Sequence, residues 1–64
     1  MTLKKLMQEI EVQGDVRLRV YNENMEKYIL DEPITGQIKT KYANHKVSYL
    51  YPGNNEFFIE IVEE

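Results

Sequence analysis

The sequence predicts an α+β protein in which an N-terminal amphipathic helix packs on an antiparallel sheet of two β-hairpins. Two observations predict this class: apolar residues first recur at helical spacing and then, from Val16 onward, at every second position. The chain has 64 residues. A chain of this length cannot bury two separate cores, so residues 1–64 are expected to form one domain.

The N-terminal segment has the spacing of a short helix. Thr2 precedes it, in the place where a side-chain oxygen caps a first turn. A helix of about nine residues is not stable alone in water, so we expect it to pack on the rest of the chain. Turn-type residues at Gln13, Gly14 and Asp15 end the segment. Four apolar side chains at i, i+3, i+4 and i+7 form its buried face: Leu3, Leu6, Met7 and Ile10.

Period-two alternation then predicts two hairpins. In the first, a strand from Val16 is followed by turn residues at 22–24 and a second extended run at 25–30. In the second, alternation at 46–51 and at 57–62 flanks the turn-forming residues 52–55. The side chains expected to face the helix are Val16, Leu18, Val20, Val47, Tyr49, Tyr51, Phe57, Ile59 and Ile61.

The segment between the hairpins, residues 31–44, fits two structures. Asp31 and Pro33 resemble a cap and a first turn, and apolar side chains at 34, 38 and 42 would share a helix face. The same residues also alternate, and Gly36 weakens a helix by about 1 kcal/mol relative to alanine. We favour a short helix, and a strand stays open.

The sequence does not indicate an enzyme. It has no cysteine and one histidine, His45, which is expected to be a surface residue in a connector. Ser48 has no patterned base near it. The acids Asp31, Glu32, Glu60, Glu63 and Glu64 do not have the spacing of a metal site and are expected to be solvated. We therefore expect no catalytic residues, no cofactor and no metal.

Charge and hydropathy limit the partners. The net charge is −3, and acids and bases are mixed along the chain, unlike the basic face of a general nucleic-acid binder. No apolar run approaches the roughly 20 residues of a membrane span, and the first residues do not form a secretory leader. The expected location is the cytoplasm, without membrane contact.

The sheet face away from the helix is the candidate site. It is expected to carry the apolar side chains of Leu50, Phe58 and Val62. A sheet face that is exposed to solvent should instead be polar. We therefore predict a contact with another protein or with a second copy, through this face or through an open strand edge. The alternatives are that Ile34 and Ile38 cover the face, or that single apolar residues are simply exposed there, which is common.

A second hypothesis uses the same face. Arg17, Arg19 and Tyr21 could contact phosphates and stack on a base, with lysines at 39, 41 and 46 nearby, so single-stranded nucleic acid is the alternative partner. Cross-strand pairing of either arginine with Glu60 would explain the arginines without a ligand.

Four segments, residues 2–6, 14–21, 41–47 and 57–61, resemble the small uncharacterised proteins of Firmicute phages and conjugative elements. The resemblance runs along the whole chain at the level of pattern. It implies a cytoplasmic accessory protein of a mobile element, such as a small inhibitor of a host defence protein or an adaptor. It implies no catalytic residues, and it favours a helix before the next-to-last strand.

Overall fold

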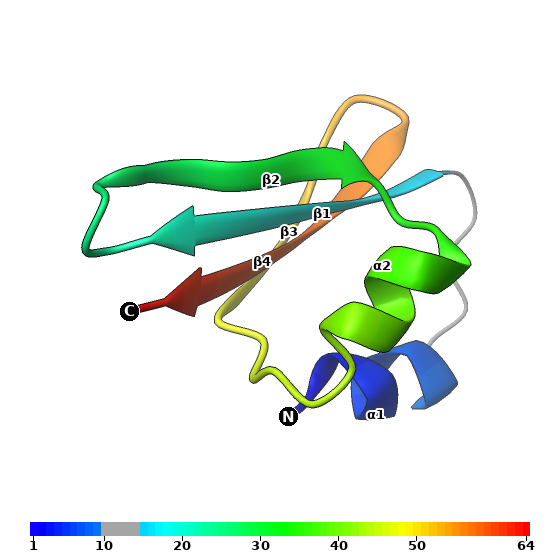
Figure 1. Cartoon of the computed structure of the whole chain (residues 1–64). Coiled ribbons are helices and arrows are strands. Elements are labelled where there is room, and N and C mark those ends of the chain that lie inside the picture. The colour runs from blue at the N-terminus through cyan, green and yellow to red at the C-terminus, as the bar shows by residue number, and fades with distance from the viewer. Residues whose placement is uncertain (10–14) are drawn as a thin grey trace.

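The computed structural model describes residues 1–9 and 15–64 and confirms the α+β class (Figure 1). Ile10, Gln13 and Gly14, which the sequence placed at the end of the helix and in the following turn, lie outside the described residues. The elements in chain order are α1 Leu3–Glu9, β1 Asp15–Asn22, β2 Lys27–Pro33, α2 Gly36–Lys41, β3 Tyr49–Pro52 and β4 Glu56–Glu63.

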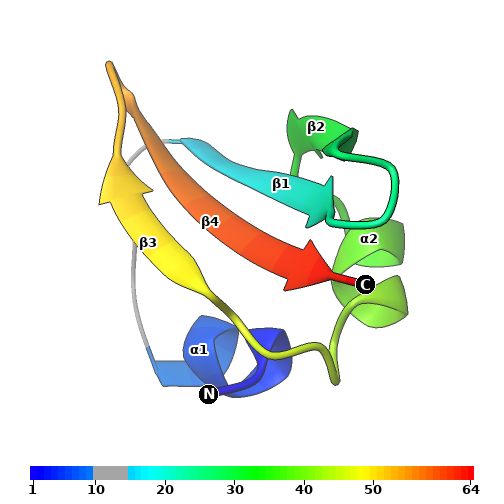
Figure 2. The same ribbon diagram turned by 90° about the vertical axis from the view of Figure 1, so that its left-hand side faces the viewer.

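The strands form one mixed sheet in the order β2-β1-β4-β3. Both predicted hairpins are present as the antiparallel pairs β1–β2 and β3–β4. The expectation of an entirely antiparallel sheet is wrong, because the central strands β1 and β4 are parallel. The connection that contains α2 leads the chain from the β2 edge to the β3 edge (Figure 2). Period-two alternation is the same beside a parallel or an antiparallel neighbour, so it does not report this pairing.

The hairpin turns form close to the predicted positions. Between β1 and β2 the turn occupies residues 23–26, where Asn22 Oδ1 accepts a hydrogen bond of 2.9 Å from Met25 N. Between β3 and β4, Gly53 N donates to Glu56 O at 2.7 Å. Asn55 in this turn has φ of 62°, in the left-handed region that asparagine tolerates. The turn chemistry of the sequence thus fixes both hairpins locally.

Helix α1 begins as the sequence indicates. Thr2 Oγ1 accepts a hydrogen bond of 3.3 Å from Lys5 N and caps the first turn. Leu3 and Leu6 are buried, so tertiary packing stabilises a helix too short to persist alone. Two backbone hydrogen bonds hold the start of α1 against the segment before β3. Leu3 N donates to His45 O and Val47 N donates to Met1 O, each at 2.9 Å.

Residues 36–41 are helical, so the helix prediction for the middle segment is confirmed. The predicted cap is wrong: Asp31 and Pro33 belong to β2, and Thr35 caps the helix by accepting from Ile38 N at 3.3 Å. Lys39 in the last turn complements the negative end of the helix dipole. The Thr35 cap, four residues after Asp31, and two basic residues in the last turn thus offset the weak helix propensity of Gly36.

Both helices lie on the same face of the sheet. Ile34 and Ile38 pack against the buried cluster, so they do not cover the opposite face, as one hypothesis from the sequence supposed. None of the described helices covers that opposite face (Figure 2). The buried apolar core consists of Leu3, Leu6, Leu18, Val20, Tyr42, Ile59 and Ile61.

The predicted orientation of β3 is wrong by one residue. Tyr49 lies opposite Glu60, Leu50 opposite Ile59 and Tyr51 opposite Phe58. Directly opposed residues share a face, so the two tyrosines lie away from the helices and Leu50 lies on the helix side. Val47 packs on the core as predicted, but β3 starts only at Tyr49. The alternation of residues 46–51 thus does not match a single regular strand, because the chain before Tyr49 is not part of β3.

Candidate functional site

The sheet face without helices, called the open face below, is the candidate site. Register places Arg17, Arg19 and Tyr21 of β1 beside Phe58 and Val62 of β4 on this face. Five of the six predicted interaction residues therefore lie together. The sixth, Leu50, does not. The open face also carries Tyr28, Tyr49, Tyr51 and Glu60.

Glu60 is the centre of a hydrogen-bond network. Its Oε1 accepts from the Tyr28 hydroxyl at 3.0 Å and from the Tyr51 hydroxyl at 2.9 Å. Tyr28 is on β2 and Tyr51 on β3, so the two side chains reach inward from both edges of the sheet. Glu60 is only 9% exposed although no second layer lies over it in the described part of the chain. Long side chains lying across the strands thus bury a carboxylate on an open sheet.

Arg19 joins this network from β1. Its Nη1 donates to the Tyr51 hydroxyl at 3.0 Å, and its guanidinium lies 4.0 Å from the ring centre of Tyr28. Its Nε is 3.4 Å from Asp31 Oδ2, an ion pair without hydrogen-bond geometry. The predicted pairing of Arg19 with Glu60 is therefore indirect, because the Tyr51 hydroxyl bridges the two groups.

Arg17 is also held by acids, but not by Glu60. Its Nε donates to Glu56 Oε2 at 2.8 Å, and its Nη1 donates to Asp31 Oδ1 at 3.1 Å and to Asp31 O at 3.0 Å. The hydrogen bond to Glu56, followed by that to Asp31, raises the pKa of Arg17 above its ordinary value. Both arginines of the open face therefore already have anionic partners.

Phe58 is part of the same surface. Its ring stacks on Tyr51, with centroids 5.1 Å apart and planes at 13°. It also lies against Gly53, where a side chain would meet the ring. These contacts leave Phe58 half-buried. A structural role in the hairpin therefore explains in large part why an apolar side chain stands on this face.

The network changes the acidity of two tyrosines. The hydrogen bond to Glu60 raises the pKa of Tyr28 above its ordinary value of 10.0, and burial adds to the rise. Burial raises the pKa of Tyr51, while the hydrogen bond from Arg19 acts in the opposite direction. Both phenols stay protonated at neutral pH, which keeps them as donors to the carboxylate.

Alkaline pH is expected to remove this contribution to stability. Because the folded-state pKa values of Tyr28 and Tyr51 are raised, their contribution is fully present below the unfolded value of 10.0 and is lost as the pH rises through the folded-state values. Urea unfolding between pH 8 and about 11 checks this. The wild type should lose stability above pH 10 more steeply than the Tyr28→Phe/Tyr51→Phe variant, and parallel curves would contradict the prediction.

A depression of about 330 Å³ lies at one end of the open face, beside the turn between β1 and β2. Tyrosine rings surround it, and two of them, Tyr21 and Tyr28, meet edge to face with centroids 5.1 Å apart. Tyr49 is 58% exposed there. The side chains that line the depression are Tyr21, Glu23, Tyr28, Tyr49, Glu60 and Val62.

The two edges of the sheet differ. Edge strand β3 has the sequence YLYP, without a charged residue, and Tyr49 and Leu50 are 58% and 46% exposed. Met1, at 59% exposed, continues this surface around a depression of about 290 Å³. Edge strand β2, with the sequence KYILDEP, carries three charged residues, and the pairing of β1 with β2 is irregular at Val20 and Tyr21.

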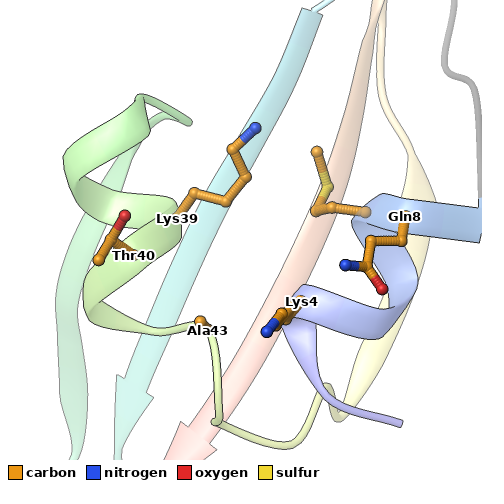
Figure 3. A pocket seen from close by; sticks show the side chains of 6 residues that line it. Lys4, Gln8, Lys39, Thr40 and Ala43 are labelled. Atoms are coloured by element: carbon orange, nitrogen blue, oxygen red, sulfur yellow. The ribbon is translucent and has the colours of Figure 1, made fainter.

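A groove of about 400 Å³ separates the two helices (Figure 3). Lys4 and Gln8 line it from α1, and Lys39 extends towards it from α2. Met7 and Ala43 contribute apolar surface. The groove is thus a basic-rimmed apolar depression, on the opposite side of the sheet from the open face.

No group of three or more His, Asp or Glu side chains that could hold a metal ion appears in the described ranges 1–9 and 15–64. His45 Nε2 lies 3.6 Å from Glu63 Oε2, and its ring meets Tyr42 edge to face at 4.9 Å. Ser48 Oγ accepts a hydrogen bond of 3.2 Å from Val62 N, which is a structural contact at the start of β3. None of the helices in these ranges has the length and apolar character needed to cross a membrane.

Three tyrosines of the site are not among the residues that the sequence predicts for it. Tyr49 and Tyr51 were assigned to the helix side because of the one-residue error in β3. Tyr28 was placed in a strand without a functional role, and the pattern gave no signal that it reaches Glu60 across β1. The available hint was the high number of tyrosines, five in 64 residues.

Comparisons of this chain with models of protein families, with curated proteins and with solved structures found no match.

Proposed function

We propose that this protein is a non-catalytic protein-interaction module that uses the β3 edge of its sheet. The observation that carries the proposal is the uncharged β3 edge, on which Tyr49 and Leu50 are exposed. Unpaired backbone groups on such an edge can bind a further strand, and natural proteins usually protect them with charges. The charged residues on β2 provide that protection at the other edge.

The first partner to test is a second copy of the chain. An isologous pair of β3 strands brings together uncharged side chains, and a domain of this size gains stability from association. We expect light scattering over a range of concentrations to show a dimer that Leu50→Lys weakens by about 10-fold or more, equivalent to about 1.4 kcal/mol. Two lysines would then lie close together at the contact.

Ile29→Lys is the matched control. Ile29 is 39% exposed on the β2 edge and lies in a strand that is already charged, so its replacement should leave the molar mass unchanged. A monomer at every concentration, or a dimer that Leu50→Lys does not affect, would contradict self-association through β3. Circular dichroism of both variants checks that the fold is retained.

Nucleic-acid binding has less support than protein binding. The hypothesis depends on Arg17 and Arg19, and each is within 3.4 Å of an acidic oxygen. Glu23 and Glu60 add further negative charge to the same surface. Phosphate contacts would need arginines without such partners.

The resemblance to small proteins of phages and conjugative elements extends the proposal to an accessory role in such an element, either as a small inhibitor or as an adaptor. A host protein would then be a partner in addition to a second copy. The genes that surround the coding sequence check this part: phage, conjugation or defence genes would support it, and a conserved housekeeping neighbourhood would contradict it.

A further inference from the structure

The tyrosine-lined depression on the open face has the composition of a binding site for a cation. Tyr21, Tyr28 and Tyr49 supply aromatic rings, and Glu23 and Glu60 supply carboxylates. Lysine and arginine are absent from the residues that line it in the described part of the chain. Aromatic rings attract a cation through their negative faces, and a nearby carboxylate adds direct charge attraction.

Glu60 gives the depression a fixed charge. Glu60 is 9% exposed, and its Oε1 accepts hydrogen bonds from two tyrosine hydroxyls at 3.0 and 2.9 Å. Hydrogen bonds to Oε2 are not found among the described residues. A charge held in this way needs little rearrangement when a ligand binds, which reduces the entropy cost of recognition.

The open face already binds one guanidinium group by the same chemistry. Arg19 lies 4.0 Å from the ring centre of Tyr28 and 5.9 Å from that of Phe58, and it pairs with Asp31. Arg19 does not line the depression. The depression thus lies beside the site that Arg19 occupies and shares the Tyr28 ring with it.

We propose that the depression formed by Tyr21, Tyr28, Tyr49 and Glu60 binds an arginine side chain of a partner protein. A planar guanidinium can stack on a tyrosine ring and donate hydrogen bonds to the carboxylate. A lysine ammonium is compact and more strongly hydrated, so it is less suited to both contacts. A second copy is not the expected source, because Arg17 and Arg19 are both engaged within their own chain. This proposal rests on one part of the proposed function, namely that the chain binds another protein, because that protein supplies the arginine.

The test is a titration of the full chain with N-acetyl-arginine amide, in which the NMR signals of the tyrosine rings are monitored. N-acetyl-citrulline amide is the neutral probe of nearly the same shape. We expect saturable shifts at Tyr21, Tyr28 and Tyr49 with the arginine probe and no saturation with citrulline. Equal responses to the two probes, or shifts spread over the whole surface, would overturn the proposal.

Variants locate the binding. Glu60→Gln keeps an oxygen for the tyrosine hydroxyls but removes the charge, and Tyr49→Leu removes one ring that is mostly exposed. Each should weaken binding of the arginine probe by about 2–5-fold. Glu32→Gln removes the same charge at an exposed position of β2 that lies opposite Leu18, on the helix side of the sheet, and should change nothing. The proposed site would be contradicted if none of the three variants changed the affinity for the arginine probe, or if all three lowered it by the same factor.

The same titration in the Leu50→Lys background separates this proposal from the proposed function. Probe binding that persists while self-association is lost supports the depression as an independent site. Dimer formation without probe binding would overturn the arginine site and leave the β3 edge as the contact. Probe binding by a protein that is monomeric at every concentration would support the site and contradict self-association.

Discussion

Ile59→Ala is expected to lower the free energy of unfolding by about 2–5 kcal/mol. Ile59 is completely buried in β4, opposite Leu18 of β1 and Leu50 of β3. The substitution removes buried apolar surface and leaves a cavity that the two flanking strands cannot close. A domain of 64 residues has a total stability of about 3–10 kcal/mol, so this single change removes much of it. Urea unfolding followed by far-ultraviolet circular dichroism measures the loss.

Ile29→Ala is the matched control, because it makes the same chemical change in an edge strand. Ile29 is 39% exposed and does not belong to the buried cluster. Its replacement should lower the free energy of unfolding by less than about 1 kcal/mol. Similar losses for the two variants would mean that the core is not centred on the β1–β4 pair.

The parts of the fold that were predictable depend on residues close together in the sequence. Thr2 and the leucines after it define α1, and Gly53 with its neighbours defines the second turn. The parallel pairing of β1 and β4 depends instead on where the chain returns after α2. No local pattern reports that return, since strands alternate in the same way beside either kind of neighbour.

The candidate site shows the same limit. Arg17, Arg19 and Tyr21 were correctly placed on one face because they alternate within a single regular strand. Leu50 was placed wrongly because β3 begins at Tyr49, after an irregular segment, and a shift of one residue exchanges the two faces. The Glu60 network could not be foreseen, because it joins residues of four strands whose order the sequence does not reveal.

Gly53→Ala is expected to lower the free energy of unfolding by about 1–3 kcal/mol, because it overpacks the second hairpin. The new Cβ would fall against Cε2 of Phe58 and 2.9 Å from its Cδ2. The ring must then move, and movement disturbs its stacking on Tyr51, whose hydroxyl donates to Glu60. Urea unfolding measures the loss of stability, and changed NMR shifts of the Tyr51 ring would report the movement.

Gly36→Ala is the matched glycine control, with the opposite expected sign. Gly36 is the first residue of α2, directly after the Thr35 cap, and a Cβ there meets nothing within 4 Å. Alanine should therefore stabilise the protein by about 0.4–1 kcal/mol, mainly because it restricts the unfolded chain. Both variants add one methyl group and restrict the unfolded chain in the same way, so opposite signs can arise only from the surroundings of the two glycines. Stabilisation by both would mean that the Phe58 ring moves without cost and does not fix the position of Tyr51.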